Sequence, residues 1–166
     1  MGELADSNLI SQMVAQNHHY ICASPDYLKA YGMPTHPNEL LRHRGLLYLS
    51  REPHGMWQLP VDGKKAFFRI SPYLRTDSGH QLLAAAKRGL GIAILPSFLA
   101  AEAICQKQLK VILPEFSPSG GNISVVYRLS NRASPKIQTL VDFLSTKIGH
   151  PAPWDSQIQN MLRQES

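Results

Sequence analysis

The sequence predicts an α/β protein, because apolar strands alternate with amphipathic helices along almost its whole length. Residues 92–95 are an uninterrupted apolar run, which is typical of a strand with both faces covered in a parallel sheet. Residues 135–148 predict the clearest amphipathic helix, with apolar side chains three and four positions apart. The 166 residues, 43% hydrophobic and 17% charged, suffice for one domain or two small lobes with a sizeable core.

The first third of the chain predicts strands and short helices in alternation. Ser24 can cap the free amides of a helix whose first position suits Pro25, and Gly32 allows that helix to end. A polar turn at residues 16–19 separates the first two strands. The expected elements are strands at 8–14 and 20–23, helices at 25–31 and 37–43, and a strand at 46–49.

The middle third begins with a hairpin and then returns to alternation. Asp62-Gly63 predicts a tight hairpin turn, and Pro60 indicates an edge strand. Ser78 with Gln81 forms a capping box for a helix that should end at Gly89. The expected elements are strands at 57–61, 65–70 and 73–75, a helix at 78–89, a strand at 92–95, a helix at 97–106 and a strand at 110–113.

The last third contains the most flexible-looking segment of the chain, SPSGGN at residues 117–122, which we expect to cross between lobes. A strand at 123–127 follows, and Ser134-Pro135 begins the amphipathic helix that Gly149 and Pro151 end. Residues 155–166 are compatible with either a short helix or disorder.

Composition narrows the cellular setting. No apolar run approaches the roughly 20 residues of a membrane span, and the N-terminus does not resemble a signal peptide, so we expect a cytoplasmic protein without a membrane partner. Cys22 and Cys105 show no C-x-x-C spacing and are expected to be buried, reduced thiols. The net charge of +5 is dispersed along the chain, so no basic stripe predicts nucleic-acid binding.

No pattern for catalysis, metal binding or cofactor binding stands out. Gly89 and Gly91 close a helix and open a strand, which is the reverse of a dinucleotide loop. No G-x-S-x-G elbow occurs, and none of the seven histidines has the spacing of a metalloprotease site. We therefore expect no catalytic residues, no metal and no cofactor.

Two helix starts remain as candidate binding sites. A helix N-terminus presents unpaired amides, so Thr76, Asp77, Ser78 and Gly79 could hold a small anion or a hydroxyl-bearing ligand. The alternative is plain capping by Asp77 or Ser78, and the Asp77 charge would itself repel a carboxylate. Ser24 offers a second helix start with the same two interpretations.

Five segments resemble, in order, the C-terminal part of LysR-type transcriptional regulators: residues 22–50, 57–59, 74–100, 108–116 and 134–144. The most characteristic reads TDSGHQLLAAAKRGLGIAILPSFLA. The resemblance implies a type 2 periplasmic-binding-protein-like fold, with a complete second lobe and a partial first lobe. It implies four parts: residues 1–23 (partial first lobe and outbound crossing strand at 20–23), 24–116 (second, effector-binding lobe), 117–150 (return crossing strand and first-lobe helix) and 151–166 (tail).

The same resemblance implies an effector-binding domain that controls transcription in response to a small molecule, a carboxylate being one candidate. DNA would be bound only through a helix-turn-helix domain that we expect to be missing from this chain. Because the first lobe would be partial, we expect its apolar surfaces to be covered by self-association, as a homodimer or larger assembly. The alternatives are a solute-binding protein of the same fold, an enzyme on the same architecture, and a fragment that binds no ligand.

Overall fold

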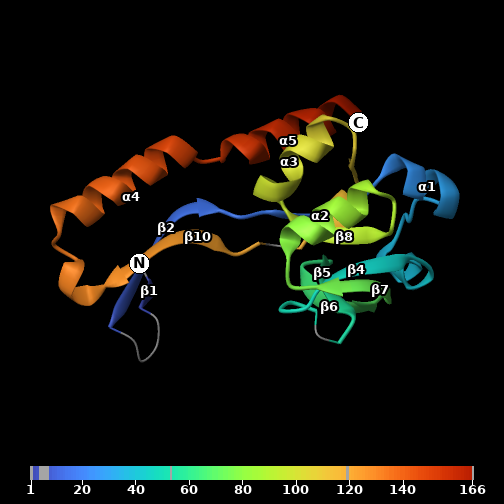
Figure 1. Ribbon diagram of the computed structural model, residues 1–166, viewed down its shortest axis with the longest axis horizontal. Helices are drawn as coiled ribbons and strands as arrows, with labels where there is room; N and C mark the ends of the chain where they lie inside the picture. The colour runs from blue at the N-terminus through green and yellow to red at the C-terminus, as the bar shows by residue number, and fades with distance from the viewer. Residues whose placement is uncertain (1, 4–7, 53, 119, 166) are drawn as a thin grey trace.

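The computed structural model of the protein describes residues 2–3, 8–52, 54–118 and 120–165. Figure 1 shows an α/β body on one side and a narrow extension on the other. The body comprises residues 19–116 within the described ranges, and the extension comprises residues 2–3, 8–16 and 122–148. Two connections join them, one at residues 17–18 and the other through residues 117–118 and 120–121.

The body is built on a five-stranded sheet with the order β7-β4-β8-β3-β9. In that order its strands are Ser71–Thr76, Arg44–Tyr48, Ile92–Pro96, His19–Ala23 and Lys110–Val111. β4 runs parallel to β7 and β8, whereas β3 runs antiparallel to β8 and β9. The carboxyl ends of β4, β7 and β8 therefore reach the same edge of the sheet as the beginning of β3.

Both faces of this sheet are covered. Ala93 and Leu95 of β8 belong to one buried apolar cluster, and Ile92 and Ile94 belong to another. This arrangement confirms the prediction for residues 92–95, because a strand buried on both faces has no need of polar alternation. The helices on the first face are α2 (Gly79–Lys87) and α3 (Ser97–Cys105), and the elements that contribute to the second are α1 (Pro25–Tyr31), η1 (Pro37–Arg42), η2 (Pro114–Phe116) and a hairpin.

That hairpin, β5 (Met56–Val61) with β6 (Lys64–Arg69), forms a separate two-stranded sheet. Asp62 and Gly63 both have positive φ, at 49° and 73°, as the central residues of a type I′ turn require. The side chains of Trp57 and Leu59, both on β5, are fully buried. The Asp62-Gly63 turn is therefore where the sequence predicts it.

The extension is a ribbon covered by one helix. β2 (Leu9–Gln16) pairs antiparallel with β10 (Asn122–Arg128), with an irregularity between Ile123 and Ser124, and β1 (Gly2–Glu3) adds to the other edge of β2. η3 (Leu129–Asn131) leads to α4 (Pro135–Ile148), which packs on β2. Val141 is the buried residue that α4 contributes, so this part has a small core.

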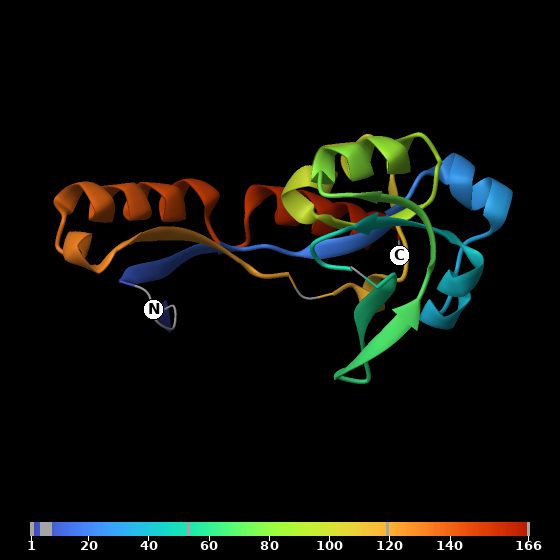
Figure 2. The same ribbon diagram turned by 60° about the horizontal axis from the view of Figure 1, so that its bottom comes forward.

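A last helix, α5 (Pro153–Glu165), carries the chain from the extension back to the body, where it packs on α3 (Figure 2). Its Ile158 is fully buried in the same apolar cluster as Leu82 and Leu95. The C-terminal tail, for which the sequence is compatible with either a short helix or disorder, is helical through Glu165. Ser166 lies outside the described residues.

Four expectations differ from the structure. Residues 37–42 form a 3-10 helix, and β9 is only two residues long, with a left-handed residue, Leu113 at φ of 49°, soon after it. Cys105 is exposed, whereas the sequence predicts a buried thiol. β3 pairs on both sides within the five-stranded sheet, so residues 20–23 belong to the body and the outbound connection lies earlier, at residues 17–18. Ser119, inside the SPSGGN segment, lies outside the described residues.

Candidate functional site

The topology gathers loop residues at one edge of the five-stranded sheet. Tyr48, Thr76 and Pro96 end the parallel strands β4, β7 and β8, and His19 begins β3 beside Pro96. In open α/β sheets, ligands bind in the crevice outside the carboxyl ends of the strands. This edge also faces the two connections to the extension.

Two pockets lie at this edge. The edge pocket, about 290 Å³, is lined by the connection at residues 17–19, the loop after β4 and the first turns of α2 and α3. The hairpin pocket, about 270 Å³, lies between the loop after β4 and the β5–β6 hairpin. Arg51 and Ile94 line both pockets, so the two are neighbours along one surface.

The edge pocket has an apolar floor and a polar rim. Its floor includes Leu82, Leu95 and Leu99. The polar side chains at its rim are Asn17, His19, Tyr48, Arg51 and His80. A concave site of this type, apolar with a few convergent polar groups, suits a small ligand.

His19 is buried at this rim, with 8% of its surface exposed. Burial and, secondly, the positive charge of Arg51 lower its pKa to about 4, against a smaller opposing effect of the Asn17 carbonyl group. The imidazole is therefore neutral near pH 7 and offers one donor and one acceptor. Its Nδ1 and the Oδ1 of Asn17 make no hydrogen bond of normal geometry within the described part of the chain.

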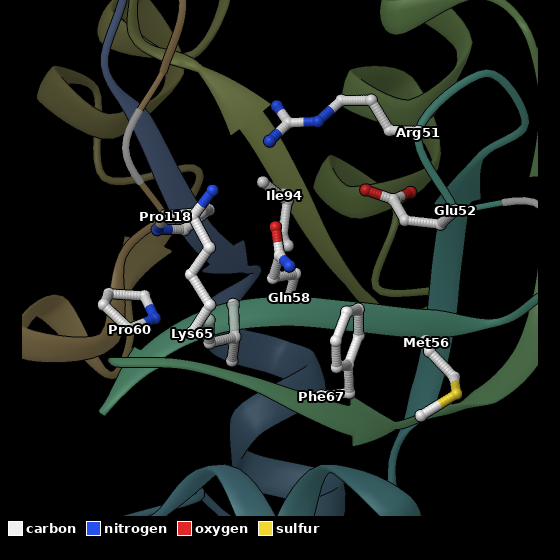
Figure 3. Close-up of a pocket in the computed structure, with 10 residues that line it drawn as sticks. Arg51, Glu52, Met56, Gln58, Pro60, Lys65, Phe67, Ile94 and Pro118 are labelled. Carbon is white, nitrogen blue, oxygen red and sulfur yellow. The ribbon is translucent and has the colours of Figure 1, made fainter. Parts of the chain in front are cut away.

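The hairpin pocket is more polar, and Figure 3 shows its lining residues. Arg51 and Glu52 come from the loop after β4, whereas Gln58 and Lys65 come from the hairpin, and their polar ends are directed into the same space. Neither Arg51 nor Lys65 forms an ion pair with a described carboxylate. Two cationic groups are thus free to meet an anion.

Glu52 lines the same pocket, but its carboxyl group accepts a hydrogen bond from the backbone. Its Oε2 accepts a hydrogen bond of 2.7 Å from the backbone N–H of Tyr48, which closes the turn after β4. Burial raises the pKa of this carboxyl group, opposed by that hydrogen bond and by Arg51. Glu52 therefore holds the loop that carries Arg51.

The first turn of α2 contributes less to the pockets than its sequence suggests. Ser78 caps the helix, accepting from the backbone N–H of Gln81 at 3.4 Å. Thr76 accepts from the backbone N–H of Ser78 at 3.1 Å, and its hydroxyl donates to the side chain of Gln81. Asp77 is exposed, and Gly79 alone among these four residues lines the edge pocket.

Ser24 lies at the opposite end of the sheet from this edge. It follows β3, whose other end is His19, so roughly 16 Å of extended chain separates the two residues. Its buried hydroxyl accepts from the backbone N–H of Tyr27 at 3.2 Å and caps α1. The structure thus does not bring Ser24 together with Thr76, Asp77, Ser78 and Gly79.

Polar pocket residues that sequence reasoning missed include Asn17, His19, Arg51 and Lys65. Arg51 follows the carboxyl end of a predicted buried strand, and that position was the available signal. The described residues contain no group of three or more His, Cys, Asp or Glu side chains placed to hold a metal ion. None of the described helices is both long and apolar enough to span a membrane.

Comparison with known proteins relates this architecture to transcription factors. The family described as LysR substrate binding domain matches residues 1–148. An uncharacterized HTH-type transcriptional regulator of Haemophilus influenzae is 36% identical over 127 residues, which cover 76% of this chain and 44% of that protein. The HTH-type transcriptional activator TtdR of Escherichia coli is 31% identical over 147 residues, covering 86% and 47%. The chain thus spans about half the length of these curated relatives.

Solved structures agree with this relationship. The regulatory domain of CrgA, a LysR-type transcriptional regulator from Neisseria meningitidis, has a TM-score of 0.76 at 27% identity, covering 89% of this chain and 72% of that chain. The regulatory domain of AphB from Vibrio vulnificus has a TM-score of 0.65 at 25% identity, covering 83% and 68%. The α/β architecture is therefore the type 2 periplasmic-binding-protein-like fold of these regulatory domains.

Proposed function

The chain belongs to the LysR family of transcriptional regulators, as an effector-binding domain, and from this premise we propose that its effector is a small carboxylate held beside Arg51. Regulators of this family act on transcription, so the bound molecule is a signal. The proposal concerns which molecule this domain binds and which side chains hold it.

The observation that carries the proposal is the position of Arg51. Its guanidinium group lines both pockets and has no carboxylate partner among the described residues. A guanidinium group presents paired N–H donors that match the two oxygens of a carboxylate, and such charge-assisted bonds are among the strong hydrogen bonds of proteins. An unpaired arginine over an apolar pocket therefore favours a carboxylate with a small apolar or hydroxylated remainder.

The surrounding side chains support the same class of ligand. Neutral His19 can donate or accept a hydrogen bond without repelling the anion or opposing Arg51 at neutral pH. Gly79 begins α2 at the pocket wall, packed so closely that an added Cβ would lie 3.0 Å from Cδ2 of Leu99. We include Thr76, Asp77 and Ser78 in the proposed site as the residues that shape this turn, and we leave out Ser24.

A thermal-shift screen tests the proposal. Small carboxylates, each paired with its uncharged amide, would be added to the purified domain. A ligand present at about 100 times its Kd should stabilise the domain by about 2.7 kcal/mol. We expect carboxylates to raise the Tm and their amides to leave it unchanged. Equal shifts from acid and amide would contradict the carboxylate assignment, and turnover of a ligand would contradict the sensor function.

Two further parts of the proposal concern the regulator as a whole. Because the chain spans about half the length of its curated relatives, we propose that DNA is bound by a helix-turn-helix region outside it. We also propose that the regulator works in the cytoplasm, where bacterial DNA is found. A filter-binding assay with promoter DNA should show no salt-sensitive affinity for this domain alone.

The extension supports self-association. Six of its large apolar side chains are between 36% and 55% exposed: Leu9, Met13, Val126, Leu129, Leu140 and Phe143. Exposed apolar surface of this kind marks protein–protein contacts, and a second copy can bury the same surface on both partners at once. We expect sedimentation velocity to show a dimer or larger species that Phe143→Asp shifts toward monomer. A wild-type chain that stays monomeric at all concentrations would contradict this part.

A further inference from the structure

α5 packs on the body but lies beyond the family match. The match ends at residue 148, and α5 begins at Pro153. Nevertheless α5 completes the body's core, because Ile158 is fully buried and Trp154 meets Phe98 edge-on, with ring centroids 6.4 Å apart. Figure 1 shows α5 lying along α3.

α5 also contacts the outbound connection between the extension and the body. The Oδ2 of Asp155 lies 3.1 Å from the Nδ1 of His18, one of the two residues between β2 and β3. Asp155 is only 1% exposed, so its side chain is shielded from water at this contact. Burial and, secondly, the Asp155 charge raise the pKa of Tyr20, the second residue of β3.

His18 lies beside the edge pocket. The neighbours of His18 on either side, Asn17 and His19, line that pocket. The carbonyl oxygen of His18 also accepts a 2.8 Å hydrogen bond from the backbone N–H of Ser97, the first residue of α3. The next two residues, Phe98 and Leu99, also line the pocket. Asp155 thus contacts a residue that is bonded to both of these lining segments.

We propose that Asp155, acting through His18, is a positioning residue of the edge pocket, and that the packing of α5 on α3 fixes the connection between body and extension. A buried carboxylate is costly unless it is paired, so α5 packs fully only while His18 keeps its place. Movement of the connection and release of α5 are therefore coupled. The proposal rests on the proposed function only in calling this pocket an effector site. Its test needs no effector.

Hydrogen exchange of Asp155→Asn tests this coupling, because the change removes the charge and keeps the shape. Losing this close contact should speed amide exchange about tenfold in α5 and also in the peptide that contains residues 17–20. Exchange in β4 and β8 should stay as in the wild type. The matched control is Asp142→Asn, the same change on the exposed side of α4, which should alter none of these peptides.

Two results would overturn the proposal. If α5 exchanges faster while residues 17–20 do not, Asp155 has only a local structural role. If every peptide of the body exchanges faster, the change is a general loss of stability. A double-mutant cycle of His18→Gln and Asp155→Asn gives the second measurement. If the two residues are coupled, the double variant should lose little more exchange protection than either single variant. Additive effects would likewise overturn the proposal.

Discussion

The backbone N–H of Asn17 donates a 2.9 Å hydrogen bond to the carbonyl oxygen of Gly121, and so joins the two connections between the extension and the body. The connections therefore cross in contact, at the edge where the two pockets lie. Gly120, the residue before Gly121, lies so close to Asn17 that a side chain has no space there. The geometry of this crossing controls both the pocket rim and the orientation of the extension.

We expect Gly120→Ala to lower the free energy of unfolding by at least about 1–3 kcal/mol, as overpacking does. The added Cβ would lie 1.1 Å from the carbonyl oxygen of Asn17, so the two connections would have to separate. The matched control is Gly121→Ala, whose Cβ would meet no atom within 4 Å. Urea unfolding of both variants measures the difference, and equal effects would contradict the close crossing.

His19 should make stability depend on pH in a defined direction. Its folded pKa is about 4, below the ordinary value of 6.5, so between these values the unfolded chain binds more protons. The contribution of neutral His19 to stability is thus complete above about pH 6.5 and is lost as the pH falls toward 4.

The variant that isolates this effect is His19→Gln, which cannot titrate in that range. We expect its Tm to fall less than that of the wild type between pH 7 and pH 4. The control is His54→Gln, at an exposed position, which should keep the wild-type profile. Parallel profiles for all three proteins would show that His19 does not carry the effect.

Ile158→Ala tests whether α5 belongs to the cooperative core. Ile158 is fully buried, so the variant should lose about 2–5 kcal/mol of unfolding free energy through lost burial and a cavity. Leu140→Ala, at a side chain 45% exposed on α4, should lose less than about 1 kcal/mol in the monomer. Chemical denaturation at low protein concentration compares them, and similar losses would mean that α5 is peripheral.

Much of the fold follows from local patterns in the sequence. Ser24 and Ser78 cap the helices that they were expected to cap, because side-chain capping depends only on residues within one turn. The Asp62-Gly63 turn is equally local. The position of β3 is not, because its neighbours β8 and β9 are distant in sequence and a crossing strand has the same apolar pattern as a sheet strand.

The α5 helix shows a second limit of local patterns. Only a narrow set of its side chains is apolar, and these become buried through contact with α3 (Ser97–Cys105), which is not a sequence neighbour of α5. Without that partner, such a polar segment is compatible with disorder. Tertiary packing therefore stabilises this helix more than its own composition does.

The candidate site was harder to predict than the fold. A helix N-terminus is visible in the sequence, and so Thr76, Asp77, Ser78 and Gly79 were the natural candidates. The hydroxyl groups of Thr76 and Ser78 form hydrogen bonds within the turn, and the free polar groups belong to isolated residues such as Arg51 and His19. Only the sheet topology brings these residues to one edge, and no local motif records that.

The most direct test of the carboxylate site is calorimetric titration of Arg51→Gln with the carboxylate that gives the largest thermal shift on the wild type. Arg88→Gln makes the same change at the far end of α2, away from both pockets. Loss of a charge-assisted hydrogen bond should weaken binding roughly ten- to hundredfold in the Arg51 variant and leave the Arg88 variant unchanged. Equal Kd values in the wild type and Arg51→Gln would contradict the proposed site.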